Sequence, residues 1–441
     1  MIKVAKFGGT SLADASQFKK VRDILLSDST RHFMVPSAPG RRFPGDTKVT
    51  DLLYHFYADV KANGNGDEAF GLIKERFIGI RDELGLNFDI ESELDTIYEN
   101  VNNGSSEDYV ASRGEYLNGL LMANYLGWDF VDPESLIVFD KRGRYNNNAT
   151  HILSARRLKE HDYAVIPGFY GSMPDGSIKT FSRGGSDITG AIIAAATDAD
   201  LYENWTDVDG FLMADPRIVK DPGHIEKITY RELRELSYMG ASVLHEDAIF
   251  PVYNAAIPIN VRNTNFPDHC GTMILPIVED EDDVKDDISI TGVAGKKNFT
   301  VISIEKNGMN AELGFGRKVL ACVEKYGLPF EHMPSGIDTL CVVVDSSKVK
   351  GALNDIVDDI HRVCEPDSVE IIGELALIAT VGRKMVRSVG CAAKLFTTLA
   401  EAHVNIRMID QGSSELNIIV GVDNKDFEKA ITAIHDAFVK R

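Results

Sequence analysis

The chain has 441 residues, 44% of them hydrophobic and 26% charged, which is typical of a globular protein with more than one core. Acidic residues outnumber basic ones by 67 to 47, and the net charge of −20 argues against a nucleic-acid partner because a phosphate backbone would be repelled. The sequence has no apolar run of about 18 residues, so we do not expect it to cross a membrane. The five cysteines lie far apart, without zinc-site or disulfide-framework spacing, which favours a cytoplasmic location.

The first 263 residues alternate between strand and helix patterns. Apolar runs that end at glycine or proline predict buried strands, and apolar residues at helical spacing predict the helices between them. We predict strands at 2–7, 32–38, 164–169, 201–206 and 257–262, helices at 18–25 and 187–197, a loop from Pro39 to Lys48, and a mainly helical region at 50–128. Such alternation indicates a mainly parallel sheet sandwiched by helices.

A strongly acidic stretch at 279–287 reads as a solvated linker between domains. Beyond it the sequence repeats itself, which predicts two small α+β modules. The matched positions include Gly314 with Gly390, Gly336 with Gly412, and Val342–Val344 with Ile418–Val420. We therefore expect one domain at 1–285 and modules at 290–368 and 369–441, which could exchange strands.

A glycine turn follows the first predicted strand. Gly8 and Gly9 would let backbone N–H groups approach phosphate oxygens at a helix N-terminus, and Lys6 would add a compact positive charge. The lysine precedes the glycines, unlike in the Walker A motif. A plain tight turn with a lysine that reaches solvent is the alternative interpretation.

A second glycine turn, at 181–187, opens the helix predicted at 187–197. Arg183 could bind a carboxylate or a phosphate through two parallel hydrogen bonds. Ser186 and Asp187 could contact a ligand, although one of them could simply cap the helix.

The loop after the 201–206 strand carries Thr206 and Asp207 and leads to Arg217. Open α/β folds bind ligands in loops at the carboxyl ends of their strands. Asp207 could accept a hydrogen bond from a ribose or an adenine, and Arg217 could stabilise phosphate charge. A turn whose aspartates bond their own backbone fits the same residues equally well.

Glu115, in the segment Arg113-Gly114-Glu115, is placed at a helix start. A buried glutamate needs a partner such as a substrate ammonium group, whereas an exposed one on a helix face needs none. The histidines and remaining acidic residues show no metal-ligand spacing, so we expect no intrinsic metal site.

These motifs, in this order and over essentially the whole chain, resemble those of the aspartate kinases within the amino-acid kinase family. The segments that carry the resemblance are KFGGTS at 6–11, RGE at 113–115, FSRGGSD at 181–187, TDVDG and ADPR within 206–217, and VLH at 243–245. The two C-terminal modules resemble the paired ACT domains, of ferredoxin-like type, through which such enzymes sense end-product amino acids. The long helical region is similar to that of the monofunctional, lysine-sensitive type.

The resemblance implies transfer of the γ-phosphoryl group of ATP to the β-carboxylate of L-aspartate, the first step of lysine, threonine and methionine synthesis. Mg²⁺ would be carried mainly by the nucleotide. Glu115 would bind the α-ammonium group of aspartate and Arg183 its α-carboxylate. The implied catalytic residues are Lys6, Arg183 and Asp187; those for aspartate are Ser37, Thr50, Glu115, Arg183 and Ser186; those for ATP are Lys6, Gly8, Gly9, Ser11, Thr206, Asp207 and Arg217.

The resemblance also implies feedback inhibition by an amino acid, with lysine favoured and threonine next. The inhibitor would lie near Met309, Phe315, Glu331 and Ser335. The modules would join chains into a homo-oligomer, a dimer or a tetramer, because small modules expose edge strands.

Three features depart from the family pattern. The loop from Pro39 to Lys48, with Arg41 and Arg42, is longer than a common version. Ser242 stands where the family often has lysine, and Leu212 where it often has tyrosine. Lys220, Lys227 or an arginine of the 39–48 loop would then have to supply the missing charge. A non-catalytic amino-acid sensor derived from a kinase, or a kinase for another amino acid, is the alternative function.

The chemistry expected of such an enzyme needs no general base, because a carboxylate acceptor is already ionised at pH 7. The obstacle is the approach of one anion to another. Catalysis should therefore consist of positioning and charge neutralisation.

Overall fold

The computed structural model describes the chain except for residues 183, 242–243, 245–248, 278–289, 387 and 440–441. It divides into two compact units. The first unit comprises residues 1–211, 226–230 and 243–279, and the second comprises residues 212–225, 231–242 and 280–441. The segments 212–225 and 231–242 thus belong to the second unit, although they precede the acidic stretch at 279–287.

The first unit is built on an eight-stranded sheet with the order β3-β4-β2-β1-β7-β9-β10-β8. All neighbouring strands are parallel except β9 and β10. The strands are β1 (Lys3–Phe7), β2 (Arg31–Pro36), β3 (Asp129–Phe130), β4 (Ala164–Val165), β7 (Leu201–Thr206), β8 (Lys227–Thr229), β9 (Ile259–Asn263) and β10 (Thr272–Leu275). A separate hairpin joins β5 (Tyr170–Ser172) and β6 (Ile178–Thr180).

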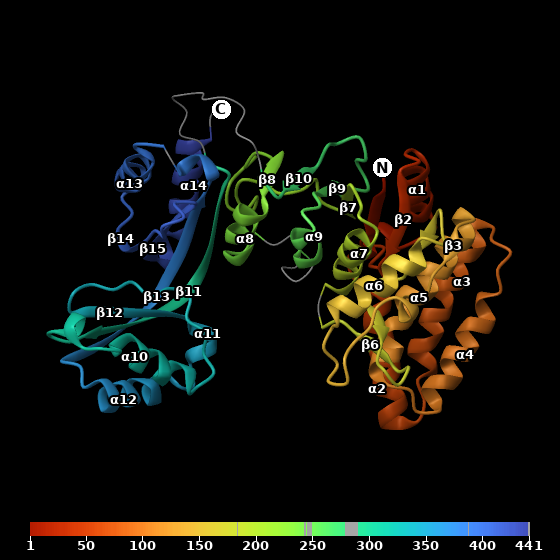
Figure 1. Cartoon of the computed structure of the whole chain (residues 1–441), viewed down its shortest axis with the longest axis horizontal. Helices are drawn as coiled ribbons and strands as arrows, with labels where there is room; N and C mark the ends of the chain where they lie inside the picture. The colour runs from red at the N-terminus through yellow and green to blue at the C-terminus, as the bar shows by residue number, and fades with distance from the viewer. Residues whose placement is uncertain (183, 242–243, 245–248, 278–289, 387, 440–441) are drawn as a thin grey trace. The chain divides into compact units, whose positions relative to one another are not determined.

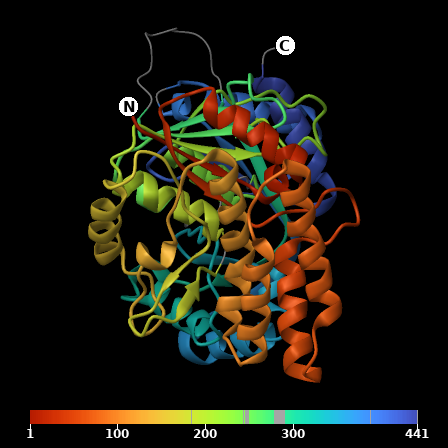
Figure 2. The same ribbon diagram turned by 90° about the vertical axis from the view of Figure 1, so that its right-hand side faces the viewer.

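Helices flank this sheet, and the long ones between residues 49 and 126 stand side by side in Figure 2. The helices are α1 (Ala15–Leu26), α2 (Val49–Asn63), α3 (Asp67–Leu84), α4 (Ile90–Asn102), α5 (Glu107–Leu126), α6 (Asn147–Leu158), α7 (Gly185–Ala196) and α9 (Phe250–Asn254). Helix α8 (Tyr230–Tyr238) begins in the first unit and continues into the second. The predicted fold class is confirmed for this part of the chain.

The two faces of β1 separate the core from the ligand side. Ala5 and Phe7 join a core cluster formed with helices α1 to α5, and both are fully buried. Successive side chains of a strand point to opposite faces, so Lys6 faces the other layer, where α7 packs against β1, β2 and β7. Because side chains alternate along β1, Lys6 points toward α7 while its neighbours Ala5 and Phe7 point into the core.

The second unit is an antiparallel five-stranded sheet with the order β12-β11-β13-β15-β14 (Figure 1). Its strands are β11 (Gly292–Glu305), β12 (Thr339–Asp345), β13 (Ser368–Val381), β14 (Ile406–Asp410) and β15 (Asn417–Asp423). Its helices are α10 (Phe315–Glu324), α11 (Ser346–Val349), α12 (Leu353–Cys364), α13 (Cys391–Glu401) and α14 (Phe427–Phe438).

Two hydrophobic cores share the long strands β11 and β13. The first core takes Ile302 and Ile304 from the end of β11 and packs them against α10 and α12. The second takes Val293 from the start of β11 and Ile378 from the end of β13, and packs them against α13 and α14. Each module therefore contains one half of β11 and one half of β13, which explains why both strands have 14 residues.

The second core also includes residues from the segment 212–225. Val219 belongs to this core, and Pro222 accepts a hydrogen bond at 2.9 Å from Nε2 of the buried His435. In the segment 231–242, the fully buried Glu232 accepts hydrogen bonds from Thr291 and from the backbone N–H of Arg383. These contacts explain why both segments belong to the second unit.

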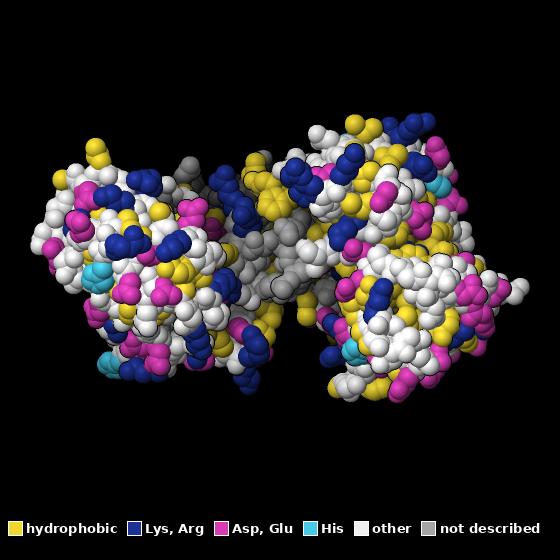
Figure 3. Space-filling model, turned by 90° about the horizontal axis from the view of Figure 1, so that it is seen from below, with side chains coloured by type: hydrophobic (Ala, Val, Ile, Leu, Met, Phe, Trp, Pro, Cys, Tyr) yellow, Lys and Arg dark blue, Asp and Glu magenta, His cyan; other side chains and the backbone are white. Residues whose placement is uncertain are grey.

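Some local predictions need correction. Arg113-Gly114-Glu115 lies in the middle of α5, not at a helix start. The strand expected at 164–169 ends at Val165, because the chain turns at Gly168 and Phe169, and Phe169 has a φ of 84°. In the part of the chain that is described, no helix is both long and apolar enough to span a membrane. Acidic and basic side chains are interspersed over the face shown in Figure 3.

Candidate active site

Lys6, Asp187 and Asn204 form a polar cluster between the sheet and α7. Lys6 and Asn204 are neighbours in the parallel pairing of β1 with β7. The ammonium of Lys6 lies 2.6 Å from Oδ1 of Asp187, and Asn204 Nδ2 donates to the same oxygen at 2.7 Å. Lys6 and Asn204 are 7% and 2% exposed, so the lysine does not reach freely into solvent. The structure thus holds a buried cation in a defined place at the carboxyl end of the sheet.

The glycine turn after β1 lies directly against two other loops. The backbone N–H of Gly8 donates to the carbonyl of Trp205 at 2.9 Å, so this N–H binds the neighbouring strand. A Cβ on Gly9 would lie 2.8 Å from the carbonyl oxygen of Ala38, and a Cβ on Gly40 would lie 2.6 Å from the Gly9 carbonyl carbon. Both glycines are therefore needed because backbone meets backbone without room for a side chain.

Glu115 is buried in the middle of α5 and is only 6% exposed. Its Oε2 has no hydrogen-bond partner among the described residues. Burial raises the pKa of this carboxyl to about 8, although the backbone N–H of Ala38 and the hydroxyl of Ser186 favour its charged form. A buried carboxyl with an unpartnered oxygen is the expected feature of a site that receives a cationic group.

The neighbour of this glutamate, Arg113, supports the helix. Its guanidinium carbon lies 4.6 Å from the ring centre of Tyr109, 4.4 Å from that of Tyr116 and 5.2 Å from that of Tyr170. Aromatic faces stabilise a guanidinium in this position. Arg113 therefore fixes the turn of α5 that carries Glu115.

The start of α7 brings the two halves of the site together. Ser186 favours the charged form of Glu115, and the next residue, Asp187, holds Lys6. Gly184 has the left-handed φ of 58° that the turn requires, and a Cβ on Gly168 would lie 2.6 Å from Ser186. Arg183, predicted to bind the α-carboxylate, lies outside the described residues.

Ser37 and Thr50 flank the loop between β2 and α2. The backbone N–H of Ser37 donates to the Phe7 carbonyl at 3.0 Å, and its own carbonyl accepts from Asn118 Nδ2 at 2.6 Å. Thr50 lies in the first turn of α2 and is half-buried. The parallel strands thus bring Ser37 next to the end of β1.

On the other side of β1, the register of β7 places Thr206 beside the glycine turn. Thr206 donates to Asp207 at 3.3 Å, and the hydroxyl groups of Ser11 and Thr264 lie 2.7 Å apart. Arg217 belongs to the second unit, where its guanidinium pairs with Asp215 at 2.6 Å and its side chain is 87% exposed. Its predicted contact with nucleotide stays a prediction.

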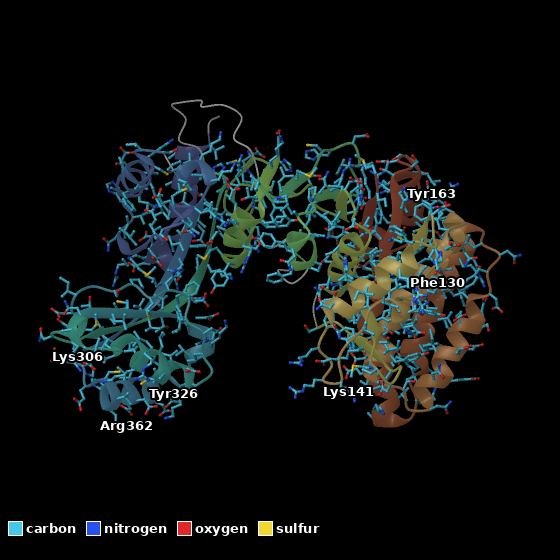
Figure 4. The ribbon with its side chains drawn as sticks, in the orientation of Figure 1. Phe130, Lys141, Tyr163, Lys306, Tyr326 and Arg362 are labelled. Carbon is cyan, nitrogen blue, oxygen red and sulfur yellow. The ribbon has the colours of Figure 1, made fainter. Side chains whose placement is uncertain are left out.

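The residues predicted to bind an inhibitor lie in the first module of the second unit. Met309 and Phe315 are buried in its core, and Lys306, labelled in Figure 4, places its ammonium 5.5 Å from the centre of the Phe315 ring. Glu331 accepts a hydrogen bond from the Tyr238 hydroxyl, and its side chain is 12% exposed. Ser335 is exposed and forms an isolated bridge with Leu340.

Sequence reasoning missed several polar residues of this site. Asn204 could have been noticed because an asparagine within a buried strand is unusual. Asn118 and Arg76 carried no local signal, since polar residues on helices are usually exposed. Ser242, the departure from the family pattern, lies outside the described residues, and Arg42 of the 39–48 loop is paired with Asp46 at 2.9 Å.

Comparisons with known proteins agree with this arrangement. Residues 1–263 match the amino acid kinase family, and residues 378–438 match an ACT domain. The chain is 39% identical to aspartokinase 3 of Bacillus subtilis, with 99% of this chain and 98% of that protein covered.

Solved structures give the same result. The aspartate kinase of Clostridium acetobutylicum superposes with a TM-score of 0.89 at 53% identity, over 99% of this chain and 100% of that one. Aspartokinase III of E. coli, solved with aspartate and ADP, superposes with a TM-score of 0.75 at 26% identity over the full length of both chains. The predicted resemblance is confirmed: the chain belongs to the aspartokinases of the amino acid kinase family.

Proposed function

We propose that this chain transfers the γ-phosphoryl group of ATP to the β-carboxylate of L-aspartate, giving ADP and 4-phospho-L-aspartate. The observation that carries this proposal is the buried Glu115, whose unpartnered oxygen lies in the same site as the Lys6–Asp187 pair. A buried carboxylate needs a cation, and the α-ammonium group of an amino acid is one. Recognition of an amino acid next to a phosphate-binding turn is what an amino-acid kinase requires.

The reaction needs charge neutralisation more than proton transfer. The side-chain carboxylate of aspartate is ionised at neutral pH, so one of its oxygens attacks the γ-phosphorus directly. The bond from that phosphorus to the bridging oxygen breaks, and ADP leaves with the electron pair. Lys6, held by Asp187, offsets the negative charge of the transferred group.

The remaining roles in this proposal follow the resemblance to the aspartate kinases. Glu115 binds the α-ammonium group and Arg183 the α-carboxylate, while Ser37, Thr50 and Ser186 complete the aspartate pocket. The nucleotide side consists of Gly8, Gly9, Ser11, Thr206, Asp207 and Arg217. Support comes from the strand register, which brings Ser37, Gly8 and Thr206 to one edge of the sheet.

Mg²⁺ enters this proposal as part of the ATP substrate. Among the described residues, no group of three or more histidine, cysteine, aspartate or glutamate side chains could hold a metal ion. Asp187, the acid next to the glycine turn, is already bound by Lys6 and Asn204. In this proposal the magnesium ion keeps many of its waters and is held mainly by the phosphates.

We also propose that an amino acid inhibits the enzyme by binding the first module near Met309, Phe315, Glu331 and Ser335. Lysine is favoured because Glu331 offers a carboxylate to a side-chain ammonium; threonine is the second candidate. Aspartokinase III of E. coli has been solved in complex with lysine and aspartate. The modules would join chains into a dimer or tetramer in the cytoplasm, and sedimentation at micromolar concentration tests that assembly.

The direct test is formation of ADP that depends on aspartate. An acyl phosphate reacts with hydroxylamine to give a hydroxamate, so product trapping identifies a phosphorylated carboxylate. We expect hydroxamate and ADP in equal amounts with aspartate, and neither with glutamate. Aspartate binding without ADP formation would instead indicate an amino-acid sensor, and turnover with another amino acid would change the substrate.

A further inference from the structure

The loop from Ser37 to Lys48 is the place where the phosphate turn and the aspartate pocket meet. The backbone N–H of Gly40 donates to the carbonyl of Gly9 at 2.7 Å, so this loop is bonded to the phosphate turn. The preceding Ala38 offers its N–H to Glu115. A shift of this loop would therefore disturb both substrates' binding groups together.

Arg76, on helix α3, holds this loop from behind. Its Nη1 donates to the Gly40 carbonyl at 2.9 Å and lies 3.4 Å from the carbonyl of Ala13. Its Nη2 donates to Asp46 Oδ2 at 2.7 Å and lies 3.3 Å from the carbonyl of Thr47. One guanidinium thus contacts the loop at both ends and also reaches Ala13, the residue that ends the short helix after the phosphate turn.

The chemistry of these contacts requires an arginine. Arg76 is 4% exposed, and a guanidinium is a planar fork that can serve several acceptors in fixed directions. An ammonium group is more compact and cannot reach the same separated oxygens. Arg42 also binds Asp46, since its backbone N–H and its guanidinium both donate to the Asp46 carboxylate. The loop therefore keeps the Arg42–Asp46 ion pair if Arg76 is replaced.

Gly9 and Gly40 are in such close backbone contact that neither can move without moving the other. A Cβ on Gly40 would lie 2.6 Å from the carbonyl carbon of Gly9 and 2.7 Å from the amide nitrogen of Thr10. Because closely packed backbone is hardly compressible, a displacement of Gly40 would also displace Gly9. Phosphoryl transfer depends on the alignment of donor and acceptor, and misplacement by about 1 Å can lower the rate by roughly a hundredfold.

We propose that Arg76 is a positioning residue for phosphoryl transfer: it fixes the Gly40 peptide, and through it the phosphate turn and the amide that faces Glu115. Arg76 is not among the residues that we propose to bind either substrate. The inference rests on the proposed aspartate kinase activity, and it gives the helical region between residues 49 and 126 a part in catalysis through α3.

The test measures kcat and KM for ATP and aspartate separately in Arg76→Met, Arg76→Lys and Arg76→Ala. We expect kcat to fall roughly tenfold to a hundredfold in Arg76→Met, with KM changed less than about threefold, because alignment rather than binding charge is lost. Arg76→Lys should recover little of that loss. Millimolar guanidinium should restore part of the activity of Arg76→Ala, whereas ammonium should not.

The matched control is Arg81→Met, which alters another arginine of α3. Arg81 pairs with Asp82 and Glu91, and among the described residues it forms no hydrogen bond or ion pair with the loop. Its replacement should therefore leave kcat within about twofold of wild type. Melting temperatures are measured for every variant, and rates are compared well below the lowest one. Asp46→Asn weakens the ion pair with Arg76 without changing any residue of α3, and it should lower kcat in the same direction as Arg76→Met.

The outcomes separate the inference from the function on which it rests. Wild-type protein without aspartate-dependent ADP formation would overturn the proposed function itself. An active wild type together with an Arg76→Met variant of unchanged kcat, or a variant whose loss follows only its melting temperature and is not restored by guanidinium, would overturn the positioning role.

Discussion

The two units of this chain bury charge in different ways. Among the described residues, buried charged side chains of the first unit are Lys6, Arg31, Arg76, Arg113, Glu115 and Glu203, whereas those of the second unit, with its one buried histidine, are Glu232, Asp359 and His435. In the first unit, Lys6 lies near the carboxyl end of β1. Glu115 and Arg76 lie on helices and contact the loop that follows β2, at Ala38 and Gly40 respectively. In the second, the cores are apolar and repeat themselves.

This difference indicates where chemistry and regulation reside. Burying a charge is costly unless a partner or a ligand compensates, so buried charges near a sheet edge mark a binding site. The second unit instead has two apolar cores on one shared sheet, and its residues 378–438 match an ACT domain. Changes in the first unit should therefore alter turnover, and changes in the second should alter the response to an inhibitor.

The largest effect is expected for Lys6→Met. The variant removes the cation that we propose to face the transferred phosphoryl group, so kcat should fall by about a hundredfold to a thousandfold. Lys3→Met makes the same chemical change at the other end of β1, where Lys3 pairs with Asp28 at 2.6 Å. Steady-state kinetics should show Lys3→Met near wild type, and equal losses in both variants would refute the assignment.

The second effect concerns pH. Burial raises the pKa of Glu115 to about 8, so below that pH the empty site holds a neutral carboxyl that must lose its proton to bind an ammonium group. The apparent affinity for aspartate should rise as pH increases, by up to about tenfold per unit below pH 8. Glu115→Gln should bind aspartate weakly and without this slope. A wild-type profile that is flat between about pH 6 and pH 8 would contradict the interpretation.

The same group also affects stability. Its pKa in the folded chain lies above the value of 4.5 for an exposed glutamate, so its contribution favours folding at low pH and is lost as pH rises toward about 8. Relative to Glu115→Gln, wild-type protein should therefore lose stability across that range. Thermal melting of both proteins at a series of pH values checks this sign.

A smaller effect is expected for Asn204→Leu, which keeps the size of the side chain but removes the donor to Asp187. Asp187 would still pair with Lys6, so kcat should fall by roughly tenfold, as for other residues that orient a functional group. Asn260→Leu on the neighbouring strand β9 is the control. Asn260 is also buried and lies beside Glu203 in the backbone register of β9 with β7, and among the described residues its Oδ1 accepts no hydrogen bond. A loss of activity in Asn260→Leu but not in Asn204→Leu would contradict the proposed role of Asn204.

The smallest effect on turnover is expected in the second unit. Tyr238→Phe removes the hydroxyl that donates to Glu331, leaving this carboxylate more available to an effector ammonium. Uninhibited kcat should stay within about twofold, while the lysine concentration for half inhibition should fall by roughly twofold to tenfold. Inhibition curves for lysine and threonine check this, and an unchanged curve for both would separate Tyr238 from regulation.

Five strands of the first unit could be predicted, in several cases because an apolar run ends in a glycine or proline turn, as at Gly8. The short strands β3, β8 and β10 were not predicted. The meeting of Lys6 with Asp187 could be expected only through the resemblance, since 180 positions of chain separate them and no local pattern pairs them. The burial of Glu115 was not predictable, because its surroundings come from the β2–α2 loop and from α7.

The repeat in the second unit was visible in the sequence as matched glycines and apolar positions. That the two modules share β11 and β13 could not be predicted beyond the possibility that they exchange strands. Strand pairing over such separations depends on long-range register, which sequence periodicity does not specify. Nor did any pattern indicate that Val219 and Glu232 would pack with the second unit, because these residues precede the acidic stretch at 279–287.

The central claim, that Lys6 serves phosphate and Glu115 serves aspartate within one site, is tested most directly by equilibrium binding of aspartate to two variants. Calorimetry at pH 7 should show that Lys6→Met binds aspartate about as tightly as wild type but does not turn over, whereas Glu115→Gln loses at least about tenfold in affinity. Normal aspartate affinity in Glu115→Gln, or normal turnover in Lys6→Met, would contradict the account.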